Sequence, residues 1–411
     1  MQFQELCTNS FCIYGAGIVA TGVYTAIKTL YHKEPLFFMV SDCEESGGHH
    51  GEVSEQTLTE IDNIAVKSLS AWERELQNSM SDFILPKYYL IAAPQVHHSA
   101  IIASLHSVEN LRIEDSQIVL FTNELENELM EAYYSSLPGH ATILGQMIQR
   151  QTQEIAEEEC NCRRCSETYT TDFRSEIPKI QVYQAKSHLD RPLLNQYIGN
   201  TQPLYIHPIQ VGAALTSQKL ADLQDNQGDN ISHKNRNYCE LTATYHAWRN
   251  CRAAYKGICH YRRIFDISDA QMKRLMELEQ EWDVILPYPS VYYPDISKEH
   301  ARYVSESDWD AMLQALKETA PEYLDAYENG IADGEQFFNN FNMLIAKAEV
   351  FDDYCNFLFK VLMRTEELTT PKGSERADRF AGYLGENLTT LYFLKNREKL
   401  KIMYAGKTWL V

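Results

Sequence analysis

The sequence predicts an α/β fold in two domains, the first of which contains a Rossmann-like, doubly wound sheet. Three observations predict this class: short apolar runs alternate with helix-like segments, a glycine-rich turn follows the first apolar run, and the alternation restarts after a polar segment. At 411 residues the chain is also longer than one hydrophobic core usually supports. We expect a first domain at 1–148, a linker at 149–177 and a second domain at 178–411.

The composition is that of a globular protein, with 44% hydrophobic and 23% charged residues. The formal net charge of -20 makes nucleic acid a poor partner, because a polyanion needs clustered Lys and Arg. The first ten residues lack the pattern of a secretion signal, and no run reaches the roughly 18 to 20 apolar residues of a membrane-spanning helix. We therefore expect a cytoplasmic protein whose ten cysteines are mostly reduced thiols.

A glycine-rich turn follows the strand-like residues 11–14. The pattern G-x-G-x-x-A is formed by Gly15, Gly17 and Ala20. Its first glycine permits a tight turn, its second lets a pyrophosphate approach the backbone, and its third position lets helix and strand pack closely. Asp42 stands where an acid would bind a ribose. Two interpretations stay open: this domain binds a nucleotide or nucleotide sugar, or it keeps the turn in a structural or regulatory role.

The polar segment 149–177 contains a C-x-C-x-x-C pattern at Cys160, Cys162 and Cys165. Thiolates bind zinc, but a structural zinc site generally takes four ligands, and no fourth ligand lies at an obvious spacing. Free or redox-labile thiols are therefore the favoured interpretation, with metal binding as the alternative.

The strand pattern of the second domain begins at 180–185 and closes at residues 186–188. Ligands of a nucleotide-binding sheet lie at this end of the strand, which makes Ala185 and His188 candidate contacts. A later loop, 225–232, is rich in turn formers and side-chain acceptors. Its candidate contacts to ribose or sugar hydroxyls are Asp225, Asp229 and Asn230. The alternative for this loop is a solvated turn.

Asn237 and Glu240 have the spacing of a capping box, so a helix is expected to begin there. Its periodicity places Leu241 on a core face and Glu240 on a face that can look into a cleft. The short strand 255–259 then delivers four polar residues at its end: His260, Tyr261, Arg262 and Arg263. Because successive strand residues point to opposite faces, at most one of the two arginines is expected to share a side with His260.

The segments D-N-Q-G-D-N-I-S, N-Y-C-E-L-T and G-I-C-H-Y-R-R-I-F resemble a bacterial family catalogued as a domain of unknown function. Members of this family are described as exopolysaccharide or capsular polysaccharide glycosyltransferases. The resemblance runs from about residue 178 to about residue 405. It implies a GT-A-like fold, a nucleoside diphosphate sugar as donor, with a UDP-sugar expected, and a saccharide or lipid-linked saccharide as acceptor.

This chain departs from the wider GT-A pattern in one respect. Most of those enzymes carry an Asp-x-Asp that holds a divalent metal, Mn²⁺ or Mg²⁺, against the diphosphate. His260 to Arg263 stand in that place here. We therefore favour chemistry without a metal, in which cationic side chains stabilise the departing diphosphate. Asp225 and Asp229 are the alternative metal ligands.

Further elements are expected downstream. A second capping box at Ser268 and Gln271 opens a helix. The aromatic loop 292–300 fits either an acceptor rim or core packing. Residues 341–346 are expected to form a central strand, with Asn342 in the acceptor cleft.

Residues 379–387 resemble the family's R-x-x-G-[aromatic]-x-G-E segment. Arg379 is a candidate acceptor contact. Inverting transfer needs a carboxylate that takes the proton of the acceptor hydroxyl, and Glu386 is the first choice for this base. The alternative is a carboxylate that is merely favoured by the helix N-terminus. With His260 and Arg263, Glu386 completes the predicted catalytic set; a retaining outcome stays open.

Two other functions are alternatives for this sequence. In one, the chain is an NAD-dependent nucleotide-sugar dehydrogenase or epimerase whose second domain binds the substrate. In the other, it is a non-catalytic scaffold that binds nucleotide sugars. The basic run 395–401 fits a solvated helix face better than a peripheral contact with the inner face of an anionic membrane.

Overall fold

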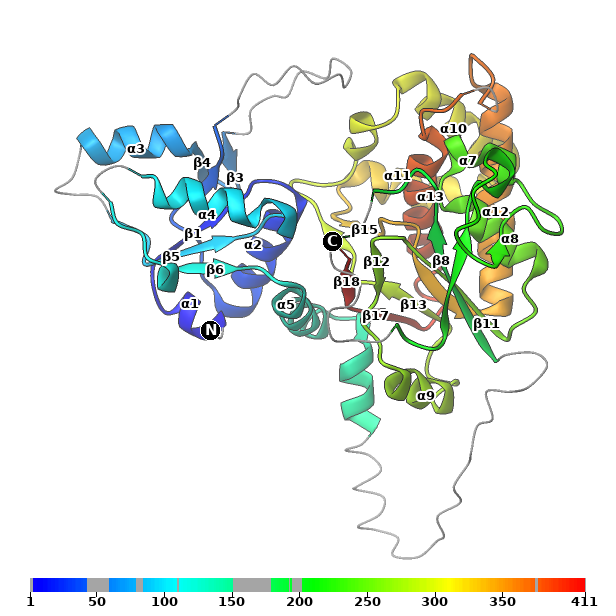
Figure 1. Ribbon diagram of the computed structural model, residues 1–411, viewed down its shortest axis with the longest axis horizontal. Helices are drawn as coiled ribbons and strands as arrows, with labels where there is room; N and C mark the ends of the chain where they lie inside the picture. Colours follow the sequence, from blue (N-terminus) through cyan, green and yellow to red (C-terminus); the bar gives the residue numbers. More distant parts are fainter. Residues whose placement is uncertain are drawn as a thin grey trace, which may run out of the picture. The chain divides into compact units, whose positions relative to one another are not determined.

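The computed structural model describes residues 3–42, 59–78, 84–108, 111–150, 179–191, 193, 202–373 and 376–410. The chain divides into two compact units, Met1–Tyr133 with Ser290–Ile296, and Tyr134–Pro289 with Ser297–Val411. Each unit contains a sheet and helices, which confirms the predicted α/β class (Figure 1). No helix in the described part of the chain is long and apolar enough to cross a membrane.

The first unit contains a six-stranded sheet in the order β3-β4-β2-β1-β5-β6. Its strands are β1 (Phe11–Tyr14), β2 (Phe38–Val40), β3 (Glu60–Ile61), β4 (Ile64–Ser68), β5 (Tyr88–Ile91) and β6 (Ile118–Leu120). All neighbours pair in parallel except β3 and β4. The strand order reverses direction between β1 and β5, which is the doubly wound arrangement expected from the sequence.

Helices surround this sheet in the order expected for a doubly wound unit. They are α1 (Phe3–Cys7), α2 (Ile18–Tyr31), α3 (Leu69–Asn78), η1 (Gln95–His97), α4 (His98–His106), η2 (Asp115–Gln117) and α5 (Asn123–Ser136). Trp72 of α3 and Leu105 of α4 are buried in one apolar cluster with Tyr14 and Met39 of the sheet. The helices therefore cover the sheet through apolar faces, as the alternation of the sequence requires.

The second unit contains an eight-stranded mixed sheet in the order β10-β9-β8-β11-β16-β13-β17-β7. Its strands are β7 (Ala141–Thr142), β8 (Ile180–Lys186), β9 (Ile206–Gln210), β10 (Leu223–Gln224), β11 (Tyr255–Cys259), β13 (Val284–Pro287), β16 (Leu344–Lys347) and β17 (Ile402–Ala405). Strands β10, β9, β8 and β11 are mutually parallel, and β16 runs antiparallel to both of its neighbours. A short ribbon joins β12 (Arg263–Phe265) to β18 (Lys407–Trp409) in antiparallel register.

The helices of the second unit lie between its strands in the sequence. They are η3 (Ala213–Leu215), η4 (Ser232–Lys234), α7 (Asn235–Tyr238), α8 (Leu241–Asn250), α9 (Asp269–Glu277), η5 (Glu299–Arg302), α10 (Glu306–Thr319), η6 (Pro321–Tyr323), α11 (Leu324–Glu328), η7 (Ile331–Asp333), α12 (Ala348–Leu368) and α13 (Phe380–Asn396). The remaining short strands are β14 (Ser290–Val291) and β15 (Phe337–Phe338).

One predicted capping box is confirmed and the other is wrong. At α9 the Ser268 hydroxyl accepts from the Gln271 N–H at 3.2 Å, and the Gln271 side chain accepts from the Ser268 N–H at 2.8 Å. At α8 the residue before the helix is Glu240, and no side chain caps it. Asn237 instead donates to the Gly373 carbonyl at 2.8 Å, because a segment distant in the sequence offers it a buried partner.

The predicted central strand at 341–346 begins later, at Leu344. Phe341 and Asn342 have φ values of 73° and 49°, which is left-handed backbone that no strand accommodates. At this turn the Phe341 N–H and the Asn342 side-chain amide donate to Glu386 and to the Gly382 carbonyl of α13.

The unit boundaries differ from the expected domain boundaries in two places. Residues 141–142 pair with β17, so this part of the expected first domain belongs to the second sheet. Residues 290–296 group with the first unit, where the Thr21 hydroxyl donates to the Val291 carbonyl at 2.9 Å. Cys160, Cys162 and Cys165, with most of the expected linker, lie outside the described residues.

Candidate functional site

A cavity of about 420 Å³ opens at the carboxyl ends of adjacent parallel strands in the second unit. Ala185 lies at the end of β8, Val211 directly follows β9, and His260 directly follows β11, and all three line the cavity. Open α/β sheets bind their ligands at this edge, because the carboxyl ends of parallel strands and the loops that follow them converge there.

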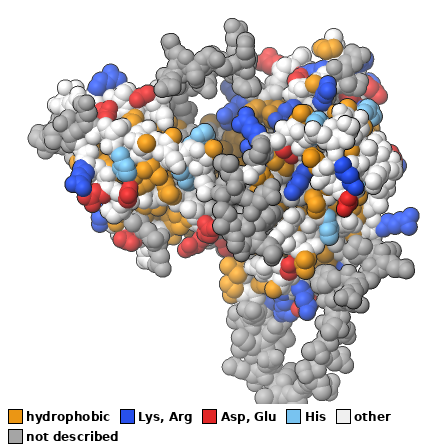
Figure 2. Space-filling view, viewed as in Figure 1, with side chains coloured by type: hydrophobic (Ala, Val, Ile, Leu, Met, Phe, Trp, Pro, Cys, Tyr) orange, Lys and Arg blue, Asp and Glu red, His pale blue; other side chains and the backbone are white. Residues whose placement is uncertain are grey.

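Four arginine residues line this cavity: Arg191, Arg236, Arg262 and Arg379. Among the described lining residues, the carboxylates that oppose them are Asp190 and Glu240. The local charge is therefore positive although the chain as a whole is acidic. On the face drawn in Figure 2, Lys and Arg side chains form separate small groups among acidic and neutral ones. A compact anion fits this site better than an extended polyanion does.

Arg262 has hydrogen-bonding capacity to spare. Its Nε is buried and has no hydrogen-bond partner among the described residues. Its guanidinium lies 5.0 Å from the ring centroid of Tyr261, which also lines the cavity. A buried donor without a partner is costly, so an anion that accepts from it would gain more than at an exposed arginine.

Asp190 was not singled out from the sequence. Its carboxylate accepts from the Ser187 N–H at 2.6 Å and so closes the turn after β8. Burial raises the pKa of Asp190 to about 6, while Arg262 and Arg379 oppose this shift. A Ser-x-x-Asp pattern directly after a strand is the signal that would have revealed it.

His260 is held as a neutral ring. Burial, with the charges of Arg263, Arg262 and Arg379, lowers the pKa of His260 well below its usual value. Its Nδ1 lies 3.2 Å from Nη1 of Arg263, which can only donate. We therefore assign the proton to Nε2, which leaves His260 one N–H to donate.

Arg263 is clamped between two aromatic rings. Its guanidinium lies 3.9 Å from the ring centroid of Phe341 and 3.9 Å from that of Trp409. Residue 409 is its partner in the β12–β18 register. Burial, with the charge of Arg262, lowers the pKa of Arg263 to about 10. The described lining residues do not include Arg263, so it orients His260 rather than facing the cavity directly.

The expected alternation of faces after β11 is wrong. The strand ends at Cys259, and residues 260–263 form a turn closed by a bridge between His260 and Arg263. In a turn the two-residue period of a strand no longer applies. Both arginines therefore contact His260: Arg263 through its guanidinium, and Arg262 through its backbone N–H, 3.2 Å from Nδ1.

Two carboxylates meet at the turn before β16. Glu240 accepts from the side-chain amide of Asn342 at 2.7 Å, and Glu386 accepts from the Phe341 N–H at 2.7 Å. Burial and then the charge of Glu240 raise the pKa of Glu386 to about 8, and burial also raises the pKa of Glu240. Both side chains keep part of their surface open, and Glu240 lines the cavity, whereas Glu386 is not among its described lining residues.

Arg379 precedes α13 as its N-cap residue, with a left-handed φ of 67°, and within the helix Tyr383 and Glu386 lie on one face because they are spaced at i and i+3. Among the described residues of α13 from Phe380 to Phe393, all are buried except Tyr383 and Glu386. Glu386 therefore lies in the second turn of this helix. The alternative explanation, a carboxylate placed for the helix N-terminus, loses its basis because that effect falls off within the first turn.

Glycine permits the close packing of this helix. A Cβ at Gly385 would lie 2.7 Å from Cδ1 of Leu241 and 3.2 Å from Oδ1 of Asn342. At Gly382 the nearest atom would be the Cys239 sulfur at 3.4 Å, an ordinary contact. Gly385 therefore lets Glu386 approach Glu240.

Asn342 does not reach an acceptor cleft. It is buried, and its amide donates to Glu240 at 2.7 Å and to the Gly382 carbonyl at 3.2 Å. Its oxygen accepts from Thr389 at 3.4 Å. With both ends engaged, Asn342 orients Glu240 instead of contacting a sugar.

The loop 225–232 is structural. Asp225 is buried and accepts from Gly212 N, Ala213 N, Ser232 Oγ and Thr242 Oγ1 at 2.5 to 3.1 Å. These four donors occupy the carboxylate, so the expected role of Asp225 as a donor contact or metal ligand has no geometric basis.

The other predicted contacts of this region also lie away from the cavity lining. Asp229 pairs with Arg249 at 2.6 Å, and the amide of Asn230 donates to carbonyls of its own loop. His188 is likewise not among the described lining residues. No cluster of three or more His, Cys, Asp or Glu side chains that would suit a metal occurs among the described residues.

Residues 195–397 match the family model described as Domain of unknown function (DUF4422). The DUF4422 match contains Arg236, Glu240, His260, Arg262 and Glu386, but it begins after β8. No curated protein gives a significant match to the chain.

Among solved structures, the chain is similar to the apo structure of the WbbM bifunctional glycosyltransferase, at 23% identity and a TM-score of 0.46. The similarity covers 56% of this chain and 45% of that chain. The chain thus spans less than half of the length of that protein.

The first unit, apart from residues 290–296, lies outside the DUF4422 match, and three of its four predicted nucleotide-binding residues make contacts within the fold. A Cβ at Gly15, whose φ is 131°, would lie 2.5 Å from the Ala92 carbonyl oxygen, so the glycine serves the packing of β1 beside β5. Ala20 is buried, and Asp42 accepts from the Ser70 N–H at 3.2 Å. A Cβ at Gly17, the N-cap of α2, would have no described atom within 4 Å, so this position has open space beside it.

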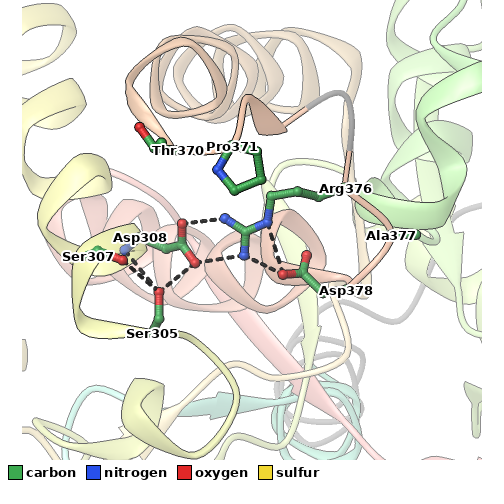
Figure 3. Close-up of a pocket in the computed structure, with 8 residues that line it drawn as sticks. All are labelled: Ser305, Ser307, Asp308, Thr370, Pro371, Arg376, Ala377 and Asp378. Atoms are coloured by element: carbon green, nitrogen blue, oxygen red, sulfur yellow. Dashed lines mark hydrogen bonds and ion pairs between the residues drawn. The ribbon is translucent and has the colours of Figure 1, made fainter.

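Within the DUF4422 segment, a second pocket of about 440 Å³ lies beside the loop that leads to Arg379 (Figure 3). Arg376 forms two hydrogen bonds with Asp308, at 2.5 and 2.8 Å, and also pairs with Asp378 (Figure 3). Asp308 is buried in the first turn of α10, where Ser305 caps the helix. Since both aspartates neutralise Arg376, we interpret this cluster as an anchor that positions Arg379.

Proposed function

We propose that the second unit transfers a sugar from a nucleoside diphosphate sugar, with a UDP-sugar as the expected donor, to a hydroxyl of a saccharide or lipid-linked saccharide. The observation that carries this proposal is the presence of four arginines around one cavity at the carboxyl ends of parallel strands. The motif resemblance supports glycosyl transfer in surface polysaccharide biosynthesis as its setting.

Arg262 and Arg379 are the best placed to hold the diphosphate. Both line the cavity, and Arg262 has a buried Nε without a partner among the described residues. His260 is neutral and donates one hydrogen bond from Nε2. We expect these three groups to stabilise the negative charge of the leaving diphosphate.

A divalent metal is not needed in this scheme. Among the described lining residues, the carboxylates are Asp190 and Glu240. Asp190 already accepts a hydrogen bond from Ser187, and Glu240 accepts one from Asn342. Their surroundings are also rich in arginine, which repels a cation. We therefore keep the expectation of activity without Mn²⁺ or Mg²⁺.

Glu386 is the proposed general base. The hydroxyl proton of the acceptor passes to the Glu386 carboxylate, and the acceptor oxygen forms a bond to the anomeric carbon. The bond from that carbon to the diphosphate oxygen breaks, and the diphosphate leaves with the electron pair. A base whose pKa lies near 8 is well matched to a hydroxyl that loses its proton only in the transition state.

The test is a donor-hydrolysis screen with UDP-glucose, UDP-galactose and UDP-N-acetylglucosamine, each with manganese and with a chelator. We expect release of UDP from at least one donor at equal rates in both conditions. Calorimetry with UDP and with NAD identifies the bound nucleotide, and Arg262→Ala should weaken UDP binding. Tight NAD binding without any binding of UDP or a UDP-sugar would replace this proposal by the dehydrogenase alternative.

A further inference from the structure

Two tyrosines form a stacked pair that the predicted site does not include. The rings of Tyr303 and Tyr383 are 4.7 Å apart between centroids, with 15° between their planes. Tyr303 directly follows η5 (Glu299–Arg302) and is 51% exposed, whereas Tyr383 belongs to the first turn of α13 and is partly open. The pair leaves about half of Tyr303 accessible to a ligand.

The pair lies beside the reacting groups. Tyr383 stands between Arg379 and Glu386 on the open face of α13, and the Arg379 guanidinium is 5.5 Å from its ring centroid. The charge of Glu299, four residues before Tyr303, also contributes to the raised pKa of Glu386, so η5 and Glu386 are close in space. The tyrosine pair therefore lies close to Arg379 and to the segment of α13 that carries the proposed base.

Such a surface suits the apolar side of a sugar ring. The face of an aromatic ring carries partial negative charge, and the C–H groups on one side of a pyranose carry partial positive charge. Tyrosine loses little conformational entropy when it binds, because only two side-chain torsions become fixed, and here stacking already holds the ring. Arg302, 5.6 Å from the Tyr303 ring centroid, lies near enough to donate to sugar hydroxyls at the rim.

We infer that Tyr303 and Tyr383 form the acceptor subsite, on which one pyranose ring of a saccharide packs with a hydroxyl directed toward Glu386. This inference rests on the proposed transfer reaction, and it names the class of acceptor and the residues that recognise it. It also replaces Asn342, whose side chain is fully engaged, as the expected acceptor contact.

The test measures saccharide contact without turnover. Saturation-transfer difference NMR on the full chain with methyl β-D-glucopyranoside, galactopyranoside and N-acetylglucosaminide should show saturation of the C–H protons on one ring face. Tyr303→Ala should weaken the contact roughly 3- to 10-fold, and Tyr303→Phe should retain it because the ring remains. Tyr245→Ala is the matched control, since Tyr245 is also partly open and packs on Trp248 and Phe359 outside the cavity lining.

Two results would overturn the acceptor subsite. One is a Tyr303→Ala protein that contacts the methyl glycosides as well as the wild type does. The other is a wild-type protein that shows no saturation transfer to any of the three glycosides, even at a glycoside concentration tenfold above that used for Tyr245→Ala. UDP affinity is measured on the same samples. A wild-type protein that does not bind UDP would contradict the proposed transfer reaction, and its contact with the glycosides could still be measured. A wild-type protein that binds UDP but fails the glycoside test would contradict the acceptor subsite alone.

Discussion

Glu386→Gln should make the protein more stable and nearly inactive at the same time. Burial and the charge of Glu240 raise the pKa of Glu386 to about 8, well above the usual value of about 4.3. At pH 7 about a tenth of the Glu386 carboxyl groups are therefore ionised. Glutamine keeps the acceptor for the Phe341 N–H and removes both the charge and the base.

The sign of the stability change follows from linkage. A carboxyl whose pKa is raised in the folded state holds its proton there, so its contribution to stability is complete below about pH 4 and is lost as the pH rises to about 8. The full shift corresponds to about 5 kcal/mol, and the partial exposure of Glu386 reduces this to about 2 kcal/mol. Glu386→Gln should therefore exceed the wild type in stability by about 2 kcal/mol at pH 8 and by almost nothing at pH 4.

The transfer activity of the wild type should rise with pH, whereas the stability contribution of Glu386 falls. Only the ionised carboxylate accepts a proton, so transfer by the wild type should rise about tenfold per pH unit between pH 5.5 and 7 and level off above about pH 8. Loss of the base should lower kcat by a factor of about 10² to 10⁴ with little change in donor affinity.

The assays are thermal unfolding of both proteins from pH 4 to 8.5 and UDP release from pH 5.5 to 9. A Glu386→Gln protein that retains activity within threefold of the wild type would refute the role of the base. A stability difference that is constant over the whole pH range would refute the raised pKa, because linkage requires it to grow with pH.

Three other substitutions test the site and its scaffold. Arg262→Ala should weaken UDP binding about 10- to 100-fold by calorimetry, whereas Arg249→Ala, which breaks an exposed pair outside the cavity lining, should change it less than twofold. Gly385→Ala should cost about 1 to 3 kcal/mol because its Cβ has no room, and Gly382→Ala should be neutral or slightly stabilising; equal melting temperatures for the two would contradict the packing argument. Asp225→Ala should lower stability by about 3 kcal/mol or more in chemical denaturation, and a loss of activity in a fully folded protein would instead restore it to the site.

The sequence predicted the local elements that depend on neighbouring residues. The strand at 255–259 was expected at the bounds observed, and the capping box at Ser268 formed as its spacing indicated. The glycine-rich turn beginning at Gly15 also lies between a strand and a helix as expected. Such features are decided by backbone geometry and periodicity over a few residues.

Predictions about side chains in loops succeeded less often. Asp225 and Arg262 both follow strands of the same sheet, and the sequence predicted that both bind the donor. The structure surrounds Asp225 with four donors and leaves the Nε of Arg262 without a partner among the described residues. Nothing near either residue in the sequence reveals this difference, because the donors to Asp225 come from as far as residue 242.

By itself, then, the sequence determined the α/β alternation, the strand that ends before His260, and the helix that carries Glu386 directly after a glycine. Only the tertiary structure decided that Glu386 meets Glu240, at a turn whose left-handed backbone breaks the expected strand. Local patterns constrain backbone torsions, whereas the ionisation of a carboxyl depends on the charges and solvent that long-range packing brings to it or removes from it.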